Sequence, residues 1–283
     1  MTTIPNFQIL ALNDAQSSEN RIHSDEIAAK YGFAGALVSG VNVFGYLSQP
    51  LVQYYKKDWL SRGIMDIAFI KPAYENNLLT IETEDLNSES SQRNHHTFAY
   101  NEDNVLIAKL ESSLPDQLPP INVKAQLRRN PEELKRNEIS WDAITLNEPT
   151  PAYLWQPTAS DNMENVTIQR DQSNIYNGES GLLHPFFILN ACNKALMRQF
   201  LLPAWIHTGS RLTLRKSLRV GQSIEVRAVP TEKWKRKGHQ FIKLYISSVV
   251  KTKIGANHLS KLSKIIFKIF TQLILFFESK LSQ

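Results

Sequence analysis

Two apolar segments, each followed by runs of alternating apolar and polar residues, dominate the pattern of this chain. The apolar segments span residues 40–55 and 185–201. In the second one, apolar residues recur at intervals of three and four and cover most sides of the predicted helix, which is typical of a helix surrounded by protein. The alternating runs have the two-residue period of strands with one buried face. The sequence therefore predicts, twice, a central helix followed by several antiparallel strands.

The two halves also match each other at a constant offset of 146 residues. The matched pairs are Trp59 with Trp205, Gly63 with Gly209, Leu78 with Ile224, and Thr80 with Val226. Because the predicted helix and strands follow in the same order, we interpret the chain as a duplicated α+β unit. We predict a first unit over residues 1–118, a linker rich in proline and charge over 119–160, and a second unit over 161–283.

The C-terminal segment has a composition of its own. Residues 233–283 contain 11 basic residues and one acid, Glu278, whereas the preceding chain has five more acids than bases. We expect the last strand at 262–270, followed by an apolar segment that contacts a homodimer partner or a membrane surface; an amphipathic helix is the alternative. A basic tail on an acidic body is not the profile of a nucleic-acid-binding protein.

Cysteine content and the N-terminal segment bear on location and cofactors. The single cysteine, Cys192, excludes an internal disulfide and a cysteine-rich metal site. A lone cysteine, together with a start that lacks a basic and a long apolar stretch, favours a cytoplasmic protein. We find no metal-ligand cluster and no nucleotide-binding loop, so we expect neither a metal nor another cofactor.

Residues 17–48 contain the candidate chemistry. A polar loop with His23 precedes a short predicted helix, a glycine-rich turn and the start of the first central helix. Histidine is a candidate acid or base near neutral pH. The free N–H groups at the start of the central helix, after Ser39 and at Gly40, can stabilise a developing oxyanion. On spacing alone, a loop histidine and glycines that only serve turns are the commoner explanation of these residues.

The same segment resembles the hydratase motif of MaoC-like dehydratases and (R)-specific enoyl-CoA hydratases. That motif reads Gly-Asp-x-Asn-Pro-aliphatic-His, and residues 17–23 here read Ser-Ser-Glu-Asn-Arg-Ile-His. The glycine-rich run that follows in the family is similar to GFAGALVSG at 32–40, and a family serine eight residues later is matched by Ser48. The resemblance implies a hotdog fold, and the duplication is similar to the double hotdog subgroup.

The implied reaction is the addition of water to the trans-2 double bond of an acyl-CoA or acyl-carrier thioester, or the reverse dehydration. By this resemblance His23 is the acid and base, and the Gly40 N–H binds the thioester oxygen. Asn20 is an orienting side chain near the substrate, and Ser48 forms a second polar wall.

The chain departs from the family pattern at the catalytic aspartate, whose position is held by Ser18. A serine cannot act as a carboxylate base. Three interpretations stay open: Glu19 replaces the aspartate through a shifted loop, His23 works without a carboxylate, or the protein binds acyl thioesters without converting them. Thioesterase chemistry on the same fold is a further alternative.

Two other groups of residues complete the candidates. Lys235 and Arg236 lie in a basic turn and are candidates for binding the phosphates of coenzyme A, although a solvated hairpin turn is the commoner explanation. His207 lies on a predicted strand, where we expect it to form structural hydrogen bonds.

Overall fold

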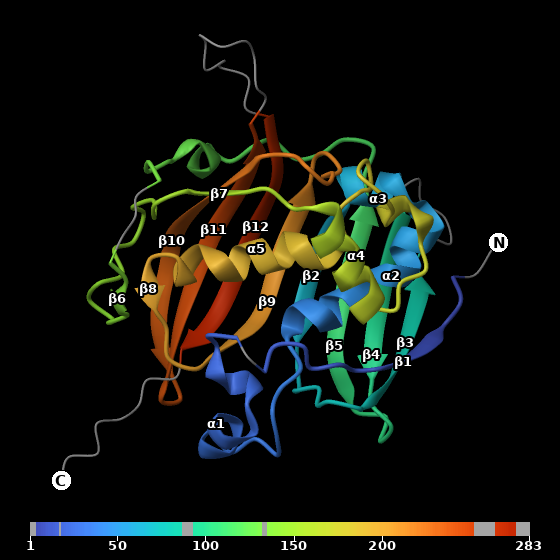
Figure 1. The fold of residues 1–283 in the computed structure, drawn as a ribbon, viewed down its shortest axis with the longest axis horizontal. Coiled ribbons are helices and arrows are strands. Elements are labelled where there is room, and N and C mark those ends of the chain that lie inside the picture. Colours follow the sequence, from blue (N-terminus) through green and yellow to red (C-terminus); the bar gives the residue numbers. More distant parts are fainter. Residues whose placement is uncertain (1–3, 17, 87–92, 132–134, 252–263, 276–283) are drawn as a thin grey trace.

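The computed structural model describes residues 4–16, 18–86, 93–131, 135–251 and 264–275, the last range by its backbone alone. Within these ranges a sheet of ten antiparallel strands curves around two long helices that lie on the same face of it (Figure 1). The helices are α1 (Asp25–Lys30), α2 (Gly40–Tyr55), α3 (Lys57–Arg62), α4 (Ala159–Ile168) and α5 (Pro185–Met197), with 3-10 turns η1 (Arg21–His23), η2 (Val123–Gln126) and η3 (Asn174–Tyr176).

The large sheet takes five strands from each half of the chain. They are β1 (Phe7–Leu10), β2 (Ile64–Phe69), β3 (Leu78–Asp85), β4 (Arg93–Tyr100) and β5 (Leu106–Leu114) in the first half. The second half contains β7 (Tyr153–Trp155), β9 (Trp205–Leu214), β10 (Ile224–Arg236), β11 (His239–Val250) and β12 (Lys264–Leu275). Two further strands, β6 (Asn137–Glu138) and β8 (Phe200–Leu201), form a separate parallel pair.

The order of the strands shows the duplication directly. The large sheet runs β1-β3-β4-β5-β2-β9-β12-β11-β10-β7, so each half contributes five strands in mirrored order. The halves meet at the antiparallel pair β2–β9, where Ile64 lies opposite Thr213 and Ala68 lies opposite Gly209. This arrangement confirms the predicted α+β duplication and makes one continuous sheet of both units.

The core lies between the sheet and the two central helices. All the residues of α2 from Val41 to Val52 are buried, including the internal Pro50. Helix α5 buries Leu189, Cys192 and Leu196 and lies against α2. Burial on all sides of α2 explains why that segment is apolar around most of its circumference. Each fully buried leucine contributes about 2 kcal/mol of transfer free energy.

Part of the matched alignment is structurally wrong. Leu78 and Ile224 begin the equivalent strands β3 and β10, as the offset requires. Trp59 lies in α3, however, whereas Trp205 begins β9, so the two tryptophans are not equivalent. A tryptophan followed four residues later by glycine fits both a helix end and a strand, because Gly63 ends α3 while Gly209 accommodates the close approach of the β2 backbone.

The predicted linker crosses to the second half and is held there by a buried carboxylate. Strand β7 pairs with β10, and η2 packs Ala125 against β10 and β11. Glu225 on β10 is 1% exposed and forms ion pairs with Arg128 of the linker, Arg227 and Lys251. Burial alone would raise the pKa of Glu225, but these three cations lower it to about 2.

The strand predicted at 262–270 is confirmed, and it extends further along the chain than expected. Strand β12 covers Lys264–Leu275, pairs with β9 and β11, and replaces the alternative of an amphipathic helix there. The residues after it, on which the expected partner or membrane contact depends, lie outside the described part of the chain. Among the described residues, no helix has the length and apolar character needed to cross a membrane.

Candidate functional site

His23 lies at the end of η1, where its ring is held in one tautomer. Its Nδ1 is 2.7 Å from the carbonyl oxygen of Leu37, an acceptor only, so Nδ1 carries the hydrogen. The lone pair is therefore on Nε2. The Asn20 Nδ2 approaches Nε2 at 3.4 Å, a long distance for a hydrogen bond, so Nε2 stays available to another donor.

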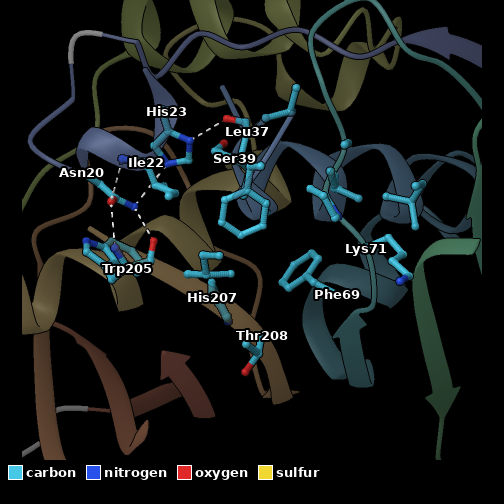
Figure 2. Close-up of a pocket in the computed structure, with 18 of the residues that line it drawn as sticks. Asn20, Ile22, His23, Leu37, Ser39, Phe69, Lys71, Trp205, His207 and Thr208 are labelled. Atoms are coloured by element: carbon cyan, nitrogen blue, oxygen red, sulfur yellow. Dashed lines mark hydrogen bonds between the residues drawn. The ribbon is translucent and has the colours of Figure 1, made fainter. Parts of the chain in front are cut away.

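Asn20 connects this histidine to the second half of the chain. Its Nδ2 donates to the Trp205 carbonyl at 2.9 Å, and its Oδ1 accepts from the Trp205 N–H at 3.2 Å. Asn20 is 5% exposed, and it also caps η1 by accepting from the Ile22 N–H. Figure 2 shows Asn20 between His23 and Trp205, with these contacts drawn. The side chain that orients His23 thus also fixes the η1 turn on β9.

The surroundings keep His23 neutral. Burial lowers the pKa of its imidazole below the ordinary value, and this effect exceeds the opposing influence of the Leu37 carbonyl and the Asp14 carboxylate. At neutral pH the ring is therefore an unprotonated base with Nε2 as its basic atom.

The N-terminus of α2 forms another wall of the site. Gly40 is the first residue of this helix, and its N–H has no acceptor among the described residues, as expected at a helix start. Ser39 is the N-cap and is 7% exposed, but its hydroxyl caps nothing and has no partner in the described structure. The ring of Phe69 packs against Gly40, where an added Cβ would lie 3.2 Å from it.

These residues line one cavity of about 310 Å³. Its walls come from η1, the loop before α2, the start of α2, the end of β2, α5 and β9, so both halves build it (Figure 2). Apolar side chains such as Ile22, Val43, Phe69 and Ile107 make up much of the lining. A mostly apolar cavity with a few polar groups is typical of a small-molecule site.

The structure brings together three of the residues predicted from the motif: Asn20, His23 and Gly40. Ser18 and Glu19 are not part of the cavity lining. The Ser18 hydroxyl donates to the Asn20 carbonyl, and the Glu19 carboxylate forms an ion pair of 2.7 Å with Arg136. With its carboxylate held by Arg136, Glu19 does not take the place of the family aspartate beside His23 in this conformation.

Ser48 lies deeper in α2, outside the cavity. Its hydroxyl donates to the carbonyl of Phe44 one helical turn earlier, and the residue is completely buried. A serine four residues past a carbonyl commonly bonds back to the helix in this way. Lys235 and Arg236, at the end of β10, are also absent from the cavity lining; the Lys235 ammonium lies 5.3 Å from the centre of the Trp141 ring.

Sequence reasoning missed the cavity residues that lie on the two strands at the junction of the halves. Phe69 is the last residue of β2 and Lys71 follows it, while Trp205, His207 and Thr208 come from β9 of the second half. The Nε2 of His207 lies 2.8 Å from the Ser210 hydroxyl and 3.2 Å from the Gly209 carbonyl, in keeping with the expected structural role, yet its ring also lines the cavity. Burial lowers the pKa of His207 to about 4, so it is neutral.

Carboxylates are absent from the described residues that line the cavity. Nor does the described part of the chain contain a group of three or more histidine, cysteine, aspartate or glutamate residues placed to hold a metal ion. The polar chemistry available here is thus the imidazoles of His23 and His207, the ammonium of Lys71, amide groups, hydroxyls and a helix N-terminus.

Comparison with known proteins identifies the fold. No family model and no curated protein sequence matches the chain. Among solved structures, a conserved hypothetical protein of Mycobacterium tuberculosis described as having a double hotdog fold matches with a TM-score of 0.71 and 11% identity, covering 98% of this chain and 97% of the other. A putative MaoC domain dehydratase from Chloroflexus aurantiacus matches with a TM-score of 0.66 and 8% identity, covering 97% and 95%.

An acyl-ACP thioesterase from Bacteroides thetaiotaomicron is also similar, with a TM-score of 0.51 and 10% identity over 95% of this chain and 97% of the other. At such low identities these likenesses concern the fold alone. The chain has the MaoC-like double hotdog fold, which confirms the fold expected from the resemblance over residues 17–48.

Proposed function

We propose that this protein binds acyl thioesters in the cavity beside His23 and adds water to the trans-2 double bond of a 2-enoyl thioester, or removes it from the 3-hydroxyacyl thioester. The observation that carries the proposal is the pairing of a neutral, fixed His23 imidazole with the open N-terminus of α2 in one mostly apolar cavity. The MaoC-like fold supports the same class of reaction.

The reaction needs a base, an acid and a stabilised enolate. The His23 Nε2 takes one proton from water as the water oxygen bonds to Cβ of the substrate. The electron pair of the double bond moves to the thioester oxygen, where the Gly40 N–H and the positive end of the α2 dipole stabilise the enolate. The protonated His23 then returns the proton to Cα. One imidazole therefore completes the cycle, and a carboxylate is not needed for the proton balance.

Non-catalytic binding of acyl thioesters is the second candidate, and a specific observation favours it. Ser18 stands where the family motif has its aspartate, and the described cavity lining contains no carboxylate to help activate the water. A histidine working alone has a smaller rate enhancement than a histidine aided by a second base, since each acid–base group contributes about 10²–10⁴-fold.

The test is the hydration of trans-2-butenoyl-CoA and trans-2-octenoyl-CoA by the purified chain, followed by the loss of enoyl absorbance. We expect His23→Ala to reduce kcat/KM by at least about 100-fold, since it removes the only acid–base group of the proposed cycle. His239→Ala is the matched control, because His239 is an exposed histidine at the start of β11, and it should keep wild-type activity.

Each other result has a definite meaning. Turnover that survives His23→Ala contradicts the assigned chemistry. If the protein binds acyl-CoA but shows no turnover, the hydratase proposal is wrong and non-catalytic binding is the function that the result supports. Release of free coenzyme A in place of hydration would instead establish a thioesterase.

A further inference from the structure

A second pocket, of about 750 Å³, lies next to the His23 cavity and has a different character. We call it the basic pocket, and define it by Arg136, Tyr153, Lys194 and Arg198, with Glu19 at its edge. These residues come from the linker, β7, the end of α5 and the loop before η1. The pocket is therefore built, like the first, from segments of both halves.

The two pockets are adjacent because the same two chain segments line both. Asn20 lines the His23 cavity and Glu19 lines the basic pocket. Likewise, Asn193 of α5 lines the cavity and Lys194 lines the basic pocket. Residues that are consecutive in the chain therefore line the His23 cavity on one side and the basic pocket on the other.

The charge of the basic pocket is not balanced within the described structure. Arg136 is paired with Glu19, whereas Lys194 and Arg198 form no ion pair with a described residue. They lie four residues apart on α5, a spacing at which like charges repel. The Arg198 guanidinium lies 5.3 Å from the centre of the Tyr153 ring, which holds it at the wall of the pocket.

Position at the end of a helix explains only part of this arrangement. Cations in the last turn of α5 interact favourably with the helix dipole. The helix dipole does not explain why Lys194 and Arg198 share a pocket with a third cation, Arg136. Desolvation, and then the positive charge of Arg198, lower the pKa of Lys194, while Asp161 raises it. A bound anion would relieve the repulsion between the two cations.

We propose that the basic pocket binds the phosphate groups of a coenzyme A thioester whose acyl group occupies the His23 cavity. Lys194 and Arg198 provide the charge, and the planar guanidinium of Arg198 matches the geometry of a phosphate. This inference rests on the proposed function, since it assumes that a thioester is the ligand. It assigns the phosphates to α5, in place of the Lys235 and Arg236 turn considered from the sequence.

The test compares two ligands that share an acyl group, a thioester and a pantetheine arm: butyryl-CoA, which has the phosphates and the nucleotide, and S-butyrylpantetheine, which has neither. Binding to the full chain is measured by isothermal titration calorimetry for wild type and for Lys194→Gln/Arg198→Gln. We expect the double variant to bind butyryl-CoA at least about tenfold more weakly, with S-butyrylpantetheine unchanged.

A control variant separates this pocket from the other cations. Lys235→Gln/Arg236→Gln removes two cations at the end of β10 that line neither pocket. This variant should keep the wild-type affinity for butyryl-CoA. An equal or greater loss in the control would assign the phosphates elsewhere and overturn the inference.

The remaining outcomes are also decisive. A double variant that loses both ligands equally would show that Lys194 and Arg198 act on the fold and not on phosphate. If wild type binds S-butyrylpantetheine as tightly as butyryl-CoA, the phosphates gain nothing and the inference fails, while the proposed function stands. If neither thioester binds, both fail together.

Discussion

The chemistry of the site depends on one residue, His23, and on how its two nitrogens are used. The Leu37 carbonyl engages Nδ1, so Nε2 is left as the base. Asn20 approaches Nε2 while bonded to the Trp205 backbone, which ties the position of the imidazole to the junction of the two halves. A single asparagine thereby couples the position of the His23 imidazole to the assembly of the fold.

The pH dependence of the reaction follows from this environment. In the proposed reaction His23 acts as the neutral base, and burial lowers the pKa of that imidazole below its ordinary value of 6.5. The acidic decline of activity should therefore be centred below pH 6.5, because protonation removes the base. The measurement is kcat/KM against pH. An acidic limb centred above 6.5 would contradict the assigned environment of His23.

At the residue scale, the sequence located the part of the site that is contiguous in the chain. Asn20, His23 and Gly40 could be predicted because a motif and a helix start are local patterns. Phe69 and His207 could not, because they reach the cavity only after β2 and β9 pair across the junction. The direction of the Glu19 side chain could not be predicted either, because its ion-pair partner, Arg136, lies more than 100 positions away in the sequence.

At the scale of the elements, the two central helices are not used equally. Helix α2 presents a free N-terminus to a cavity, whereas the N-terminus of α5 is closed. His184 caps α5 by accepting from the Phe186 N–H, and its other nitrogen lies 3.5 Å from the buried Asp171 carboxylate. Gln169 donates to Asn42 of α2 close by. Polar side chains thus occupy the space at the N-terminus of α5, whereas the equivalent space at the N-terminus of α2 is the candidate site.

This packing gives a stability prediction for Gly45 of α2. A Cβ at Gly45 would lie 2.1 Å from the Gln169 Oε1 and 3.2 Å from His184. Gly45→Ala should therefore lower the free energy of unfolding by about 1–3 kcal/mol, as measured by chemical denaturation. The Gly45→Ala/Gln169→Ala double variant should lose less than the sum of the two single variants, because it removes the clash. Strict additivity would show that the two residues do not meet.

The boundaries of helices and strands could be predicted well where a pattern was long. The segment 40–55 corresponds to α2, and β3 and β10 begin at the residues that the offset matched. The Trp59 match failed because a tryptophan followed four residues later by glycine occurs at the end of a short helix in one half and in a strand in the other. The path of the linker could not be predicted either, since the pairing of Glu225 with Arg128 joins residues far apart in sequence.

At the scale of the whole molecule, duplication explains how one chain builds the cavity. The β2–β9 pair joins the units into one sheet, and the η1 turn of the first unit docks on β9 of the second. The site therefore needs both halves, although its motif lies in the first alone. The MaoC-like double hotdog fold provides this junction, and the local residues decide what happens there.

The most direct test of the account is a crystal structure of the chain with a non-reactive thioether analogue of butyryl-CoA that keeps the carbonyl oxygen. We predict that the carbonyl oxygen of the analogue lies within hydrogen-bonding distance of the Gly40 N–H. Its acyl chain should lie between Phe69 and Val43, with the Cβ of the acyl group facing the His23 Nε2. An analogue bound outside this cavity, or one whose carbonyl points away from the start of α2, would contradict the account.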